Sequence, residues 1–323
     1  MLHLETQNLL LIVMSENTSL DNFLTLEELG LHSSSAQYPA FIFAILMYTL
    51  ILIFNSMVLL SIVTSKTLHK PMFLLLCNLP ISDMVGASAF FPHLVFGIIT
   101  KNRIISYNSC MFQGFLIHFY GTANLLTLSA MAYDRYIAIC SPLRYNSIMT
   151  MQTLVKLIIM IWFTNVGIIG TLFALHVRLK ICRTKIVDLY CNNPSLLKLA
   201  CFSSNTMLIN YYGVFNIVLL QGGTLLVIMY TYMQILRLCI MSKQTEVRSK
   251  AAQTCSSHLV SFLVLQINTV IALSAHRLTN ASSFLRRSMG VSVVIFPPFL
   301  DPIIYGLSSR EIKTAFFGLL KRN

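Results

Sequence analysis

Long apolar stretches alternate with short polar segments along almost the whole chain. Each stretch reaches the roughly 20 residues that a helix needs to cross the hydrocarbon core of a bilayer. Backbone polar groups in lipid need internal partners, and these stretches far exceed the length of a barrel strand, so the pattern predicts helices packed in one bundle. The predicted spans cover residues 40–64, 72–99, 107–139, 153–177, 207–239, 257–276 and 287–307.

The seven predicted spans account for most of the length and leave no separate soluble domain. The predicted fold class is an all-α membrane protein with a seven-transmembrane helix bundle. We expect residues 1–39 to form an extracellular N-terminal tail and residues 40–308 to form the transmembrane domain. Residues 309–323 are expected to form a short amphipathic eighth helix and a cytoplasmic tail.

The charges around the first span indicate its orientation. The first 65 residues contain no Lys or Arg, whereas Lys66 and Lys70 closely follow the first span. Because Lys and Arg next to a span are retained on the cytoplasmic side, the N-terminus is expected outside the cell and the C-terminus inside. The chain is therefore predicted to be a multi-pass protein of the plasma membrane.

Composition narrows the classes of partner. Hydrophobic residues make up 56% of the chain and charged residues only 11%, which excludes an ordinary soluble domain. The formal net charge is +12 and falls mainly on the predicted cytoplasmic side. Such a charge suits anionic membrane lipid or an acidic protein surface, and nucleic acid is not an expected partner.

An acid and a base, Asp134 and Arg135, stand next to each other at the inner end of the third span. Charged groups at a membrane are costly unless they pair or face the bundle interior, so they indicate a functional site by default. We therefore predict a switch at the cytoplasmic face, formed by these residues and Tyr136. The alternative is that both charged side chains only extend to the membrane surface.

Polar residues recur inside the apolar spans at Asn55, Asp83, Asn124 and Asp301. Two carboxylates in a membrane need a hydrated cavity, a cation or donor partners, so Asp83 and Asp301 favour an ion or water site, with Na⁺ as the candidate at Asp83. For the two asparagines the alternative is a bond to a neighbouring backbone or side chain. Pro302 removes a backbone donor directly after Asp301, which allows this helix to kink and rearrange.

Four cysteines are expected outside the membrane: Cys110, Cys182, Cys191 and Cys201. The oxidising compartment there allows them to form disulfides, whereas the other four are expected to be free. Asn17 begins an Asn-Thr-Ser sequence in the predicted extracellular tail, and N-glycosylation is expected there. The sequence leaves open whether translation starts at Met1 or at Met14.

Helical spacing in the outer halves of three spans places a set of residues where they could line a ligand pocket. Arg277 offers a planar donor fork that matches a carboxylate. The alternatives are that Arg277 reaches lipid headgroups or pairs with Asp188, and that His118 is a satisfied interior histidine. The aromatic run at Tyr211 could equally be packing. The candidates are Ile117, His118, Gly121 and Thr122 from the third span, Met207 and Tyr211 from the fifth, and Gln266, Val270, Leu273 and Arg277 from the sixth.

Catalysis is not expected, because no nucleophile and base are arranged for it and the histidines lack a metal-ligand spacing such as His-Glu-x-x-His. No cofactor is predicted beyond the candidate Na⁺. A channel or ion-coupled transporter that uses Asp83 and Asp301 is the rival membrane function. The absence of an internal repeat argues against a transporter built from inverted repeats.

Four sequence blocks occur in order along the chain: Leu68 to Phe73, Met131 to Tyr145, Lys250 to Leu259, and Pro297 to Gly306. Together with the seven spans, these blocks resemble the olfactory receptors, a branch of the rhodopsin-class G-protein-coupled receptors. The long outer loop with three cysteines is also similar to that of this family. The resemblance covers almost the whole predicted bundle.

The resemblance implies a receptor that binds a small-molecule odorant, activates a heterotrimeric G protein of the stimulatory olfactory type and raises cyclic AMP. His276-Arg277 and Pro297-Pro298 look most like the class I, or fish-like, branch. That branch tends toward water-soluble odorants, so the expected ligand is a small polar or acidic molecule. The alternative is a rhodopsin-class receptor for a non-odorant metabolite.

The resemblance also assigns roles to individual residues. Asp134 and Arg135 would hold the inactive arrangement by pairing, and Tyr232 and Tyr305 would support the open one, in which the inner part of the sixth helix moves outward. The full switch set is Asp134, Arg135, Tyr136, Tyr232, Asp301, Pro302 and Tyr305. The implied disulfides join Cys110 to Cys191 and Cys182 to Cys201.

The chain departs from the pattern of this family at three positions. Asp301 stands where olfactory receptors usually have Asn, and Asn124 where they often have Glu, so the set of ligands for sodium is altered. Gln266 replaces the usual aromatic residue at the pocket floor. Ile117 stands where amine receptors carry Asp, which disfavours a cationic amine as the ligand.

Overall fold

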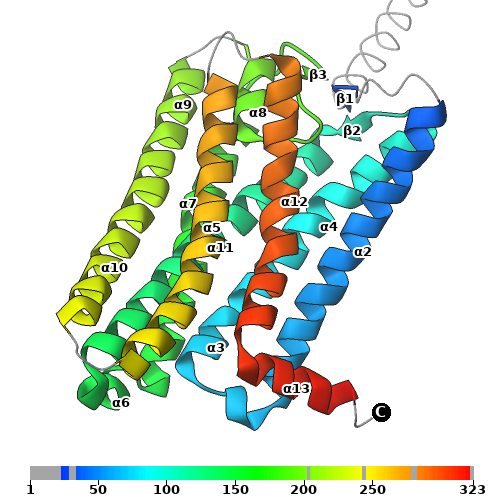
Figure 1. Cartoon of the computed structure of the whole chain (residues 1–323). Helices are drawn as coiled ribbons and strands as arrows, with labels where there is room; N and C mark the ends of the chain where they lie inside the picture. The colour runs from blue at the N-terminus through cyan, green and yellow to red at the C-terminus, as the bar shows by residue number, and fades with distance from the viewer. Residues whose placement is uncertain (1–22, 29–33, 202–203, 242–244, 278–281, 321–323) are drawn as a thin grey trace, which may run out of the picture.

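The structure is a computed structural model that describes residues 23–28, 34–201, 204–241, 245–277 and 282–320. Seven helical segments in this described part are long and apolar enough to cross a membrane, which confirms the predicted fold class. Figure 1 shows them side by side in one bundle. The spans are α2 (Ser34–Thr64), α3 (Pro71–Leu76) with α4 (Asn78–Thr100), α5 (Tyr107–Cys140), α7 (Met151–Val177), α9 (Ser204–Ile217) with α10 (Gly223–Met241), α11 (Thr245–Arg277) and α12 (Ser283–Ser308).

Side-chain caps determine where several of these helices begin. The Ser106 hydroxyl oxygen accepts a hydrogen bond from the backbone N–H of Ser109 at the start of α5. Thr150 and Ser282 act in the same way at the starts of α7 and α12. Each cap satisfies an N–H group that has no partner within its own helix.

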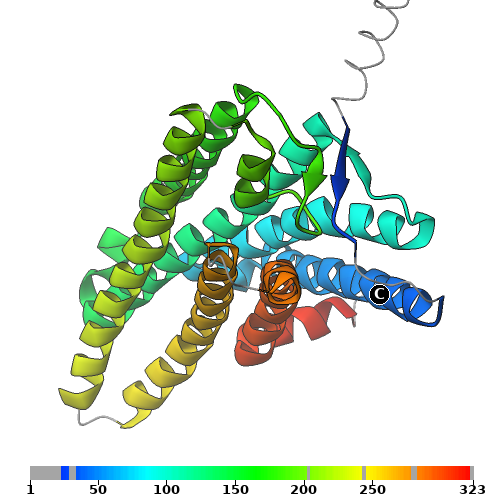
Figure 2. The ribbon, with the colours of Figure 1, turned by 90° about the horizontal axis from the view of Figure 1, so that it is seen from above.

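Three short strands cover one end of the bundle, which we call the outer end (Figure 2). β1 (Phe23–Leu26) lies between β2 (Ile104–Ser106), to which it is antiparallel, and β3 (Lys185–Ile186), to which it is parallel. Leu24 and Leu26 are buried, and the residues that alternate with them are exposed, as in a half-buried strand. Part of the predicted tail is thus built into the fold, whereas Asn17 lies outside the described residues.

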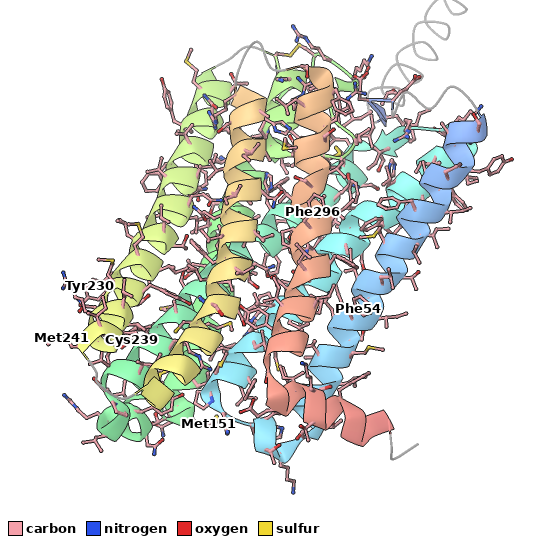
Figure 3. The ribbon with its side chains drawn as sticks, in the orientation of Figure 1. Phe54, Met151, Tyr230, Cys239, Met241 and Phe296 are labelled. Carbon is pink, nitrogen blue, oxygen red and sulfur yellow. A yellow bond between two sulfur atoms is a disulfide. The ribbon has the colours of Figure 1, made fainter. Side chains whose placement is uncertain are left out.

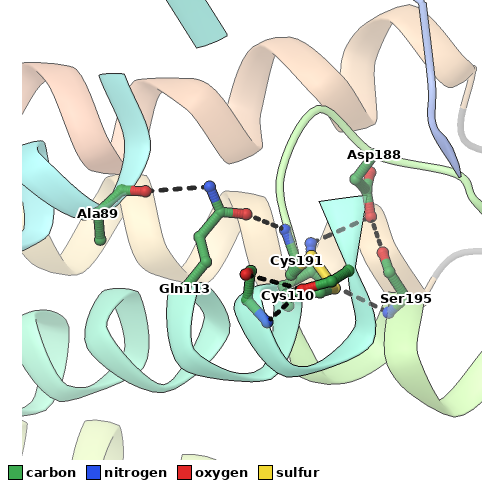
Figure 4. Close-up of a disulfide and its surroundings, with 9 residues drawn as sticks. Ala89, Cys110, Gln113, Asp188, Cys191 and Ser195 are labelled. Atoms are coloured by element: carbon green, nitrogen blue, oxygen red, sulfur yellow. Dashed lines mark hydrogen bonds between the residues drawn. A yellow bond between two sulfur atoms is a disulfide. The ribbon is translucent and has the colours of Figure 1, made fainter. Parts of the chain in front are cut away.

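Both disulfides implied by the resemblance are present at the outer end, joining Cys110 to Cys191 and Cys182 to Cys201. The first ties the loop between α7 and α9 to the start of α5 (Figure 4). Within this loop lies a short helix, α8 (Asn193–Leu199). The loop is therefore a folded cover over the outer end and not a free connection.

The opposite end of the bundle, the inner end, carries short connections and α13 (Arg310–Leu320) (Figure 1). Ile312 of α13 is buried against the bundle, whereas its neighbours Glu311 and Lys313 are exposed. This division confirms the predicted amphipathic eighth helix. The other inner elements are α6 (Tyr145–Ile148) and the 3₁₀ turns Lys66–Leu68 and Pro142–Arg144.

The fifth and seventh spans are irregular within the membrane. A π-helical turn, Val218–Gly222, separates α9 from α10 in the fifth span, and such turns occur frequently at functional sites. The seventh span, α12, contains Pro297, Pro298 and Pro302, each of which removes a backbone donor. Rearrangement therefore costs less at these two places than in a regular helix.

The sides of the bundle are apolar. Large hydrophobic side chains remain exposed there, among them Tyr230, Met241 and Phe296, which Figure 3 labels. A continuous apolar surface of this kind would be costly in water but matches the hydrocarbon of lipid tails. The exposed surface and the seven spans together identify a multi-pass membrane protein.

The α4 helix approaches α5 closely at Gly86, where a Cβ atom would lie 2.5 Å from Cγ of Tyr120. Tyr120 is fully buried, and its hydroxyl donates to the carbonyl of Val293 at 2.9 Å, so the ring has little freedom to move. We predict that Gly86→Ala lowers the free energy of unfolding by about 1–3 kcal/mol, the usual cost of overpacking. The melting temperature of the purified protein in detergent measures this loss.

Gly167→Ala is the matched control, because nothing lies within 4 Å of a Cβ atom at Gly167. Alanine there gains only helix propensity, about 1 kcal/mol relative to glycine, so the melting temperature should hold or rise. A melting temperature of Gly86→Ala equal to that of the control would contradict the close packing of α4 on α5.

Candidate functional site

A cavity of about 160 Å³ lies between α5, the fifth span and α11, beneath the outer loop. We call it the inner cavity, because it lies inside the bundle, although it is near the outer end. A cavity of roughly 150 Å³ is large enough for a molecule the size of benzene. Its wall is mostly apolar with a few polar groups, which is the usual composition of a small-molecule site. The wall residues that matter below are Ile117, His118, Gly121, Thr122, Asn216, Gln221, Thr269, Leu273, His276 and Arg277.

The structure brings six of the ten predicted pocket residues to this wall: Ile117, His118, Gly121, Thr122, Leu273 and Arg277. Met207, Tyr211 and Val270 do not line this cavity and have exposed fractions of 50%, 70% and 44%. Gln266 is buried outside the wall and donates to the carbonyl of Gln221 at 3.4 Å.

The positions of Tyr211 and Val270 follow from the rotation of each helix about its own axis. In the fifth span Gly213 faces the cavity, and Tyr211 stands two residues away, about 200° around the helix. On α11 Thr269 faces the cavity, and Val270 is turned from it by about 100°. Spacing in the sequence identifies which residues share a face, but it does not tell which face points inward.

Asn216 and Gln221 were missed by the sequence analysis, although both reach the cavity from the fifth span. The Nε2 atom of Gln221 donates to Oγ1 of Thr269 in α11 at 3.0 Å. Oε1 of Gln221 and Nδ2 of Asn216 are buried without a hydrogen-bond partner in the described part of the chain. Because unpaired buried polar atoms are costly, these two atoms are suited to bind a polar ligand. Amides within an apolar span were the signal that could have found them.

Arg277 lies at the outer end of α11, where its exposed side chain lines the cavity. Among the described residues, no carboxylate forms an ion pair with it. The alternative of a pair between Arg277 and Asp188 is wrong, because Asp188 binds His276 and Arg286 instead. The Arg277 guanidinium is therefore available to an anion in the cavity.

Asp188 is the centre of a buried network that ties the outer loop to α11 and α12. Its Oδ2 atom lies 3.2 Å from Nε2 of His276 and accepts from Nδ2 of Asn192 at 3.1 Å, and Oδ1 accepts from Nε of Arg286 at 3.3 Å. The Ser195 hydroxyl also donates to Oδ2, as Figure 4 shows. The carboxylate thus receives bonds from the loop itself and from two spans.

Protonation in this network follows from the geometry. Burial alone would raise the pKa of Asp188, but the hydrogen bond and charge of His276, with the bonds from Ser195 and Asn192, lower it well below its usual range. Nδ1 of His276 lies 2.7 Å from the carbonyl oxygen of Ala272, so both ring nitrogens face acceptors.

His118 lines the cavity and is also held by the outer loop. Its Nε2 atom accepts from the backbone N–H of Asn193 at 3.2 Å, and its ring packs on Phe173 with the centroids 5.6 Å apart. Oδ1 of Asn193 in turn bonds Nε2 of His176 at 2.7 Å. His118 is therefore an interior histidine with hydrogen-bond and packing partners in the protein, as the alternative for it held. It supports α8 above the cavity.

The polar residues within the spans form a buried cluster among α2, α4, α5 and α12. Nδ2 of Asn124 donates to Oδ1 of Asp83 at 2.7 Å, and the Ser82 hydroxyl donates to Oδ1 of Asn124. Nδ2 of Asn55 donates to the carbonyl of Pro298 at 2.8 Å, which joins the first span to the seventh. Both asparagines therefore bond to neighbours, as the alternative for them held.

The unpaired oxygens in this cluster suit a cation. Oδ2 of Asp83, Oδ1 of Asn55 and the carboxyl oxygens of Asp301 are buried without a hydrogen-bond partner among the described residues. The two carboxylates are also close enough to repel each other when charged. Hard cations take oxygen ligands, and a positive charge would offset this repulsion. The residues present thus fit the Na⁺ expected at Asp83.

At the inner end, Asp134 and Arg135 do not form an ion pair in the described structure. Asp134 is buried and accepts a hydrogen bond from the Tyr145 hydroxyl of α6 at 2.8 Å, whereas Nε of Arg135 has no partner among the described residues. Adjacent residues on a helix point about 100° apart, so these side chains face different neighbours. The expected pair is replaced by a tie from α5 to α6. Burial and the Asp134 carboxylate raise the pKa of Tyr145, which keeps it a donor.

His258 joins three spans in the inner half of the bundle. Its Nε2 atom lies 2.8 Å from the carbonyl oxygen of Leu128 in α5, and its Nδ1 atom lies 2.7 Å from the Tyr232 hydroxyl of α10. Because a carbonyl only accepts, Nε2 donates to Leu128. The Tyr232 hydroxyl also donates to the carbonyl of Cys255 in α11 at 3.0 Å. Tyr232, assigned to the open state by the resemblance, therefore holds α10 to α11 in this structure.

The other members of the switch set lie in α12 and near the inner end of α5. Asp301, Pro302 and Tyr305 are buried in α12, and the Tyr305 hydroxyl has no partner among the described residues. Tyr136 of α5 lies beside Tyr230 of α10, with the ring centroids 6.1 Å apart. The Tyr305 hydroxyl is thus available to a new partner if the inner ends of the helices move.

Comparisons with known proteins agree with this geometry. A family model described as olfactory receptor matches residues 43–322. Olfactory receptor 4K14 of Homo sapiens is 33% identical over 93% of this chain and 97% of its own length, and olfactory receptor 4E2 of Mus musculus is 31% identical over 85% and 88%. The crystal structure of squid rhodopsin has the same fold, with a TM-score of 0.71 and 16% identity over 88% of this chain and 85% of that one.

We predict that Asp188→Asn lowers the free energy of unfolding by about 3–5 kcal/mol, because it leaves His276 and Arg286 without their buried counter-ion. Since the pKa of Asp188 is lowered in the folded state, its contribution is fully present above about pH 4, the ordinary carboxyl pKa, and is lost as the pH falls further. Melting temperatures of both proteins from pH 7 down to acid conditions measure this difference, which should narrow at low pH.

Glu27→Gln is the control for a carboxylate at the same end of the molecule. Glu27 pairs with Lys185 at 3.8 Å, but the Lys185 side chain is 70% exposed. Loss of such a surface pair should change stability by at most about 1 kcal/mol. Equal effects of the two substitutions would contradict the central role of Asp188.

Proposed function

The chain belongs to the olfactory receptor family, and we propose that it binds a small polar or acidic odorant in the inner cavity and activates a heterotrimeric G protein. Members of this family are multi-pass proteins of the plasma membrane and are not enzymes. The observation that carries the proposal is an apolar cavity between spans with unpaired polar atoms in its wall and an unpaired Arg277.

The ligand class follows from the distribution of polarity in the cavity. Ile117 and Leu273 offer apolar surface to a short alkyl or aromatic group, while Asn216 and Gln221 offer a donor and an acceptor. A carboxylate would bind the Arg277 guanidinium with charge-assisted hydrogen bonds. A small carboxylic acid therefore suits Arg277, Asn216 and the apolar surface, and a hydroxyl or other donor on the same molecule would pair with Oε1 of Gln221. The class I branch remains a prediction from the sequence motifs.

Two features support an extracellular outer end. Both disulfides lie there, and disulfides form in the oxidising compartment. Lys66 and Lys70 lie at the inner end, where anionic lipid and the G protein would meet basic residues. Lys243 lies outside the described residues, as do the side chains of Arg248 and Lys250, so a contact of these three with lipid or the G protein stays a prediction.

Ligand binding would act on the sixth span, because α11 contributes Leu273 and Arg277 to the cavity and His258 to the inner contacts. A ligand that binds more tightly when α11 has moved shifts the balance toward that state by its difference in affinity. Outward movement of inner α11 would break the bond from His258 to Leu128 and open a surface near Arg135. A stimulatory olfactory-type G protein would bind there, and cyclic AMP would rise.

Sodium is a second part of the proposal. Asp83, Asp301 and Asn55 would hold the ion, whose charge would offset the two carboxylates. The residues themselves connect four spans through Asn124, Asn55 and the α12 backbone. Stabilisation of the ion-bound arrangement would favour the state seen in this structure.

We predict that Arg277→Ala reduces potency for short carboxylic acids by about 10- to 100-fold, as expected for loss of charge-assisted hydrogen bonds. Matched neutral alcohols should lose much less. The measurement is cyclic AMP in cells that carry the receptor and a stimulatory olfactory-type G protein, with surface expression verified.

Leu273→Ala and Val270→Ala form a matched pair that separates the cavity wall from the outside of α11. The first should lower potency for acids and alcohols alike by about tenfold, and the second should change neither. Acid responses that persist without Arg277 would contradict the anchor, and equal effects of the pair would contradict the cavity.

We predict that His258→Phe raises basal cyclic AMP signalling by about 2- to 10-fold, because α11 loses a hydrogen bond to α5 that holds the closed state. His258→Gln keeps a donor at this position and should restore most of the low basal signal. Receptor number at the surface normalises the readout.

Ser129→Ala is the control for the loss of a hydrogen bond that does not join two helices. The Ser129 hydroxyl donates to the carbonyl of Leu125 within α5 at 2.9 Å. Its loss should leave basal signalling unchanged. A basal level in His258→Phe no higher than in this control would contradict the proposed tie.

A further inference from the structure

A second cavity of about 410 Å³ opens at the outer end, beside the inner one. The two share four wall residues: Asn193, Pro194, His276 and Arg277. The remaining wall comes from α8 and α9, which pack against each other at the outer end (Figures 1 and 2). Any molecule in this outer cavity therefore touches the same arginine as a molecule in the inner one.

The wall of the outer cavity carries positive charge without negative charge. Of the described residues that line it, Lys198 and Arg277 are basic and none is Asp or Glu. Neither cation forms an ion pair with a carboxylate in the described part of the chain. Another polar side chain of the wall, His276, bonds Asp188, a buried carboxylate that is also bound by Arg286. An anion is the species that such a wall favours.

The α8 helix holds Lys198 in place more firmly than an ordinary loop would. Leu196 and Leu199 are buried, so Lys198 is left on the exposed side of the helix. The disulfides at Cys191 and Cys201 tether the chain just before and just after α8. The cation is therefore presented to the cavity by a helix that is fixed at both ends.

Neutral polar groups complete the wall. Asn210 of α9 is exposed and lines the cavity, and Met207, which the sequence analysis placed in the ligand pocket, lines it as well. The amide can bond an anion, and the thioether offers apolar surface beside it. The wall thus suits an anionic group that carries an apolar tail.

We propose that the outer cavity is a second binding site, in which Lys198 and Arg277 bind an organic anion before it reaches the inner cavity. The link to the inner cavity rests on the proposed odorant function, whereas binding in the outer cavity does not. The anionic group can come from a free carboxylate or from the headgroup of an acidic lipid. Both sources have the same chemistry at this wall.

The test measures charge selectivity at a cysteine placed in the outer cavity. Asn210→Cys in receptor reconstituted in phosphatidylcholine nanodiscs is labelled with methanethiosulfonate reagents of opposite charge. We expect the ratio of the anionic to the cationic labelling rate to be about tenfold higher at Asn210→Cys than at Ile104→Cys on the exposed outer sheet. High salt, which screens charge, should remove the gain.

Charge variants identify the source of the selectivity. Lys198→Gln and Arg277→Gln, each combined with Asn210→Cys, should lower the ratio several-fold. Lys185→Gln removes the same charge from β3, outside the cavity, and should leave the ratio unchanged. A melting temperature within about 2 °C of the parent confirms that each variant is folded. A ratio equal to that at Ile104→Cys, or one insensitive to Lys198, would overturn the proposal.

Competition then separates the two sources of anion. Butyrate should slow anionic labelling if the site takes free carboxylates, and phosphatidylglycerol in the nanodisc should slow it if the site takes a headgroup. Labelling slowed by neither would overturn binding in this cavity. Labelling requires no signalling. Loss of the acid response in cells therefore contradicts the odorant proposal without affecting this one, and loss of charge-selective labelling contradicts this proposal without affecting the odorant one.

Discussion

The structure depends on the need to pair polar groups where no water is available. In the described spans several side chains meet this need across helices: Asn55 bonds the α12 backbone, Tyr120 bonds the carbonyl of Val293, and His258 bonds the carbonyl of Leu128. Each of these bonds fixes one helix against another, because an unpaired donor in this environment is costly. Van der Waals packing between the spans fills the remaining space, as the close approach at Gly86 shows.

Some groups in the described part of the chain escape this rule, and two sets of them lie close to the proposed sites. Asn216 and Gln221 keep unpaired atoms at the cavity, and Asp83 and Asp301 keep unpaired oxygens in the polar cluster. Native proteins retain such groups where a ligand or ion completes the bonding. The fifth and seventh spans are also irregular near these groups, since the π-helical turn includes Gln221 and Pro302 directly follows Asp301 in α12. Unpaired polar groups and weakened helical hydrogen bonding thus occur together in these two parts of the bundle.

The outer loop connects recognition to the bundle. Asp188 links it to α11 through His276 and to α12 through Arg286, so the cover over the cavity and the helix that would move share one charge network. Arg277, the neighbour of His276, forms no ion pair among the described residues and lines both cavities. One end of α11 thus carries the proposed anion-binding group, and the other carries the His258 bond to α5. The helix between them would be the physical connection between a ligand and the inner end of the bundle.

The sequence by itself determined the seven spans, the amphipathic eighth helix and the family, because span length, apolar composition and motif blocks are local properties of the chain. Only the tertiary structure decided which face of a helix points inward. Leu273 faces the cavity and Val270 does not, and Asn216 replaces Tyr211, since rotation of a helix about its axis depends on the neighbours that it packs against. The partners of charges were decided in the same way: Asp134 bonds Tyr145 and Asp188 bonds His276, because distant segments meet only when the bundle closes.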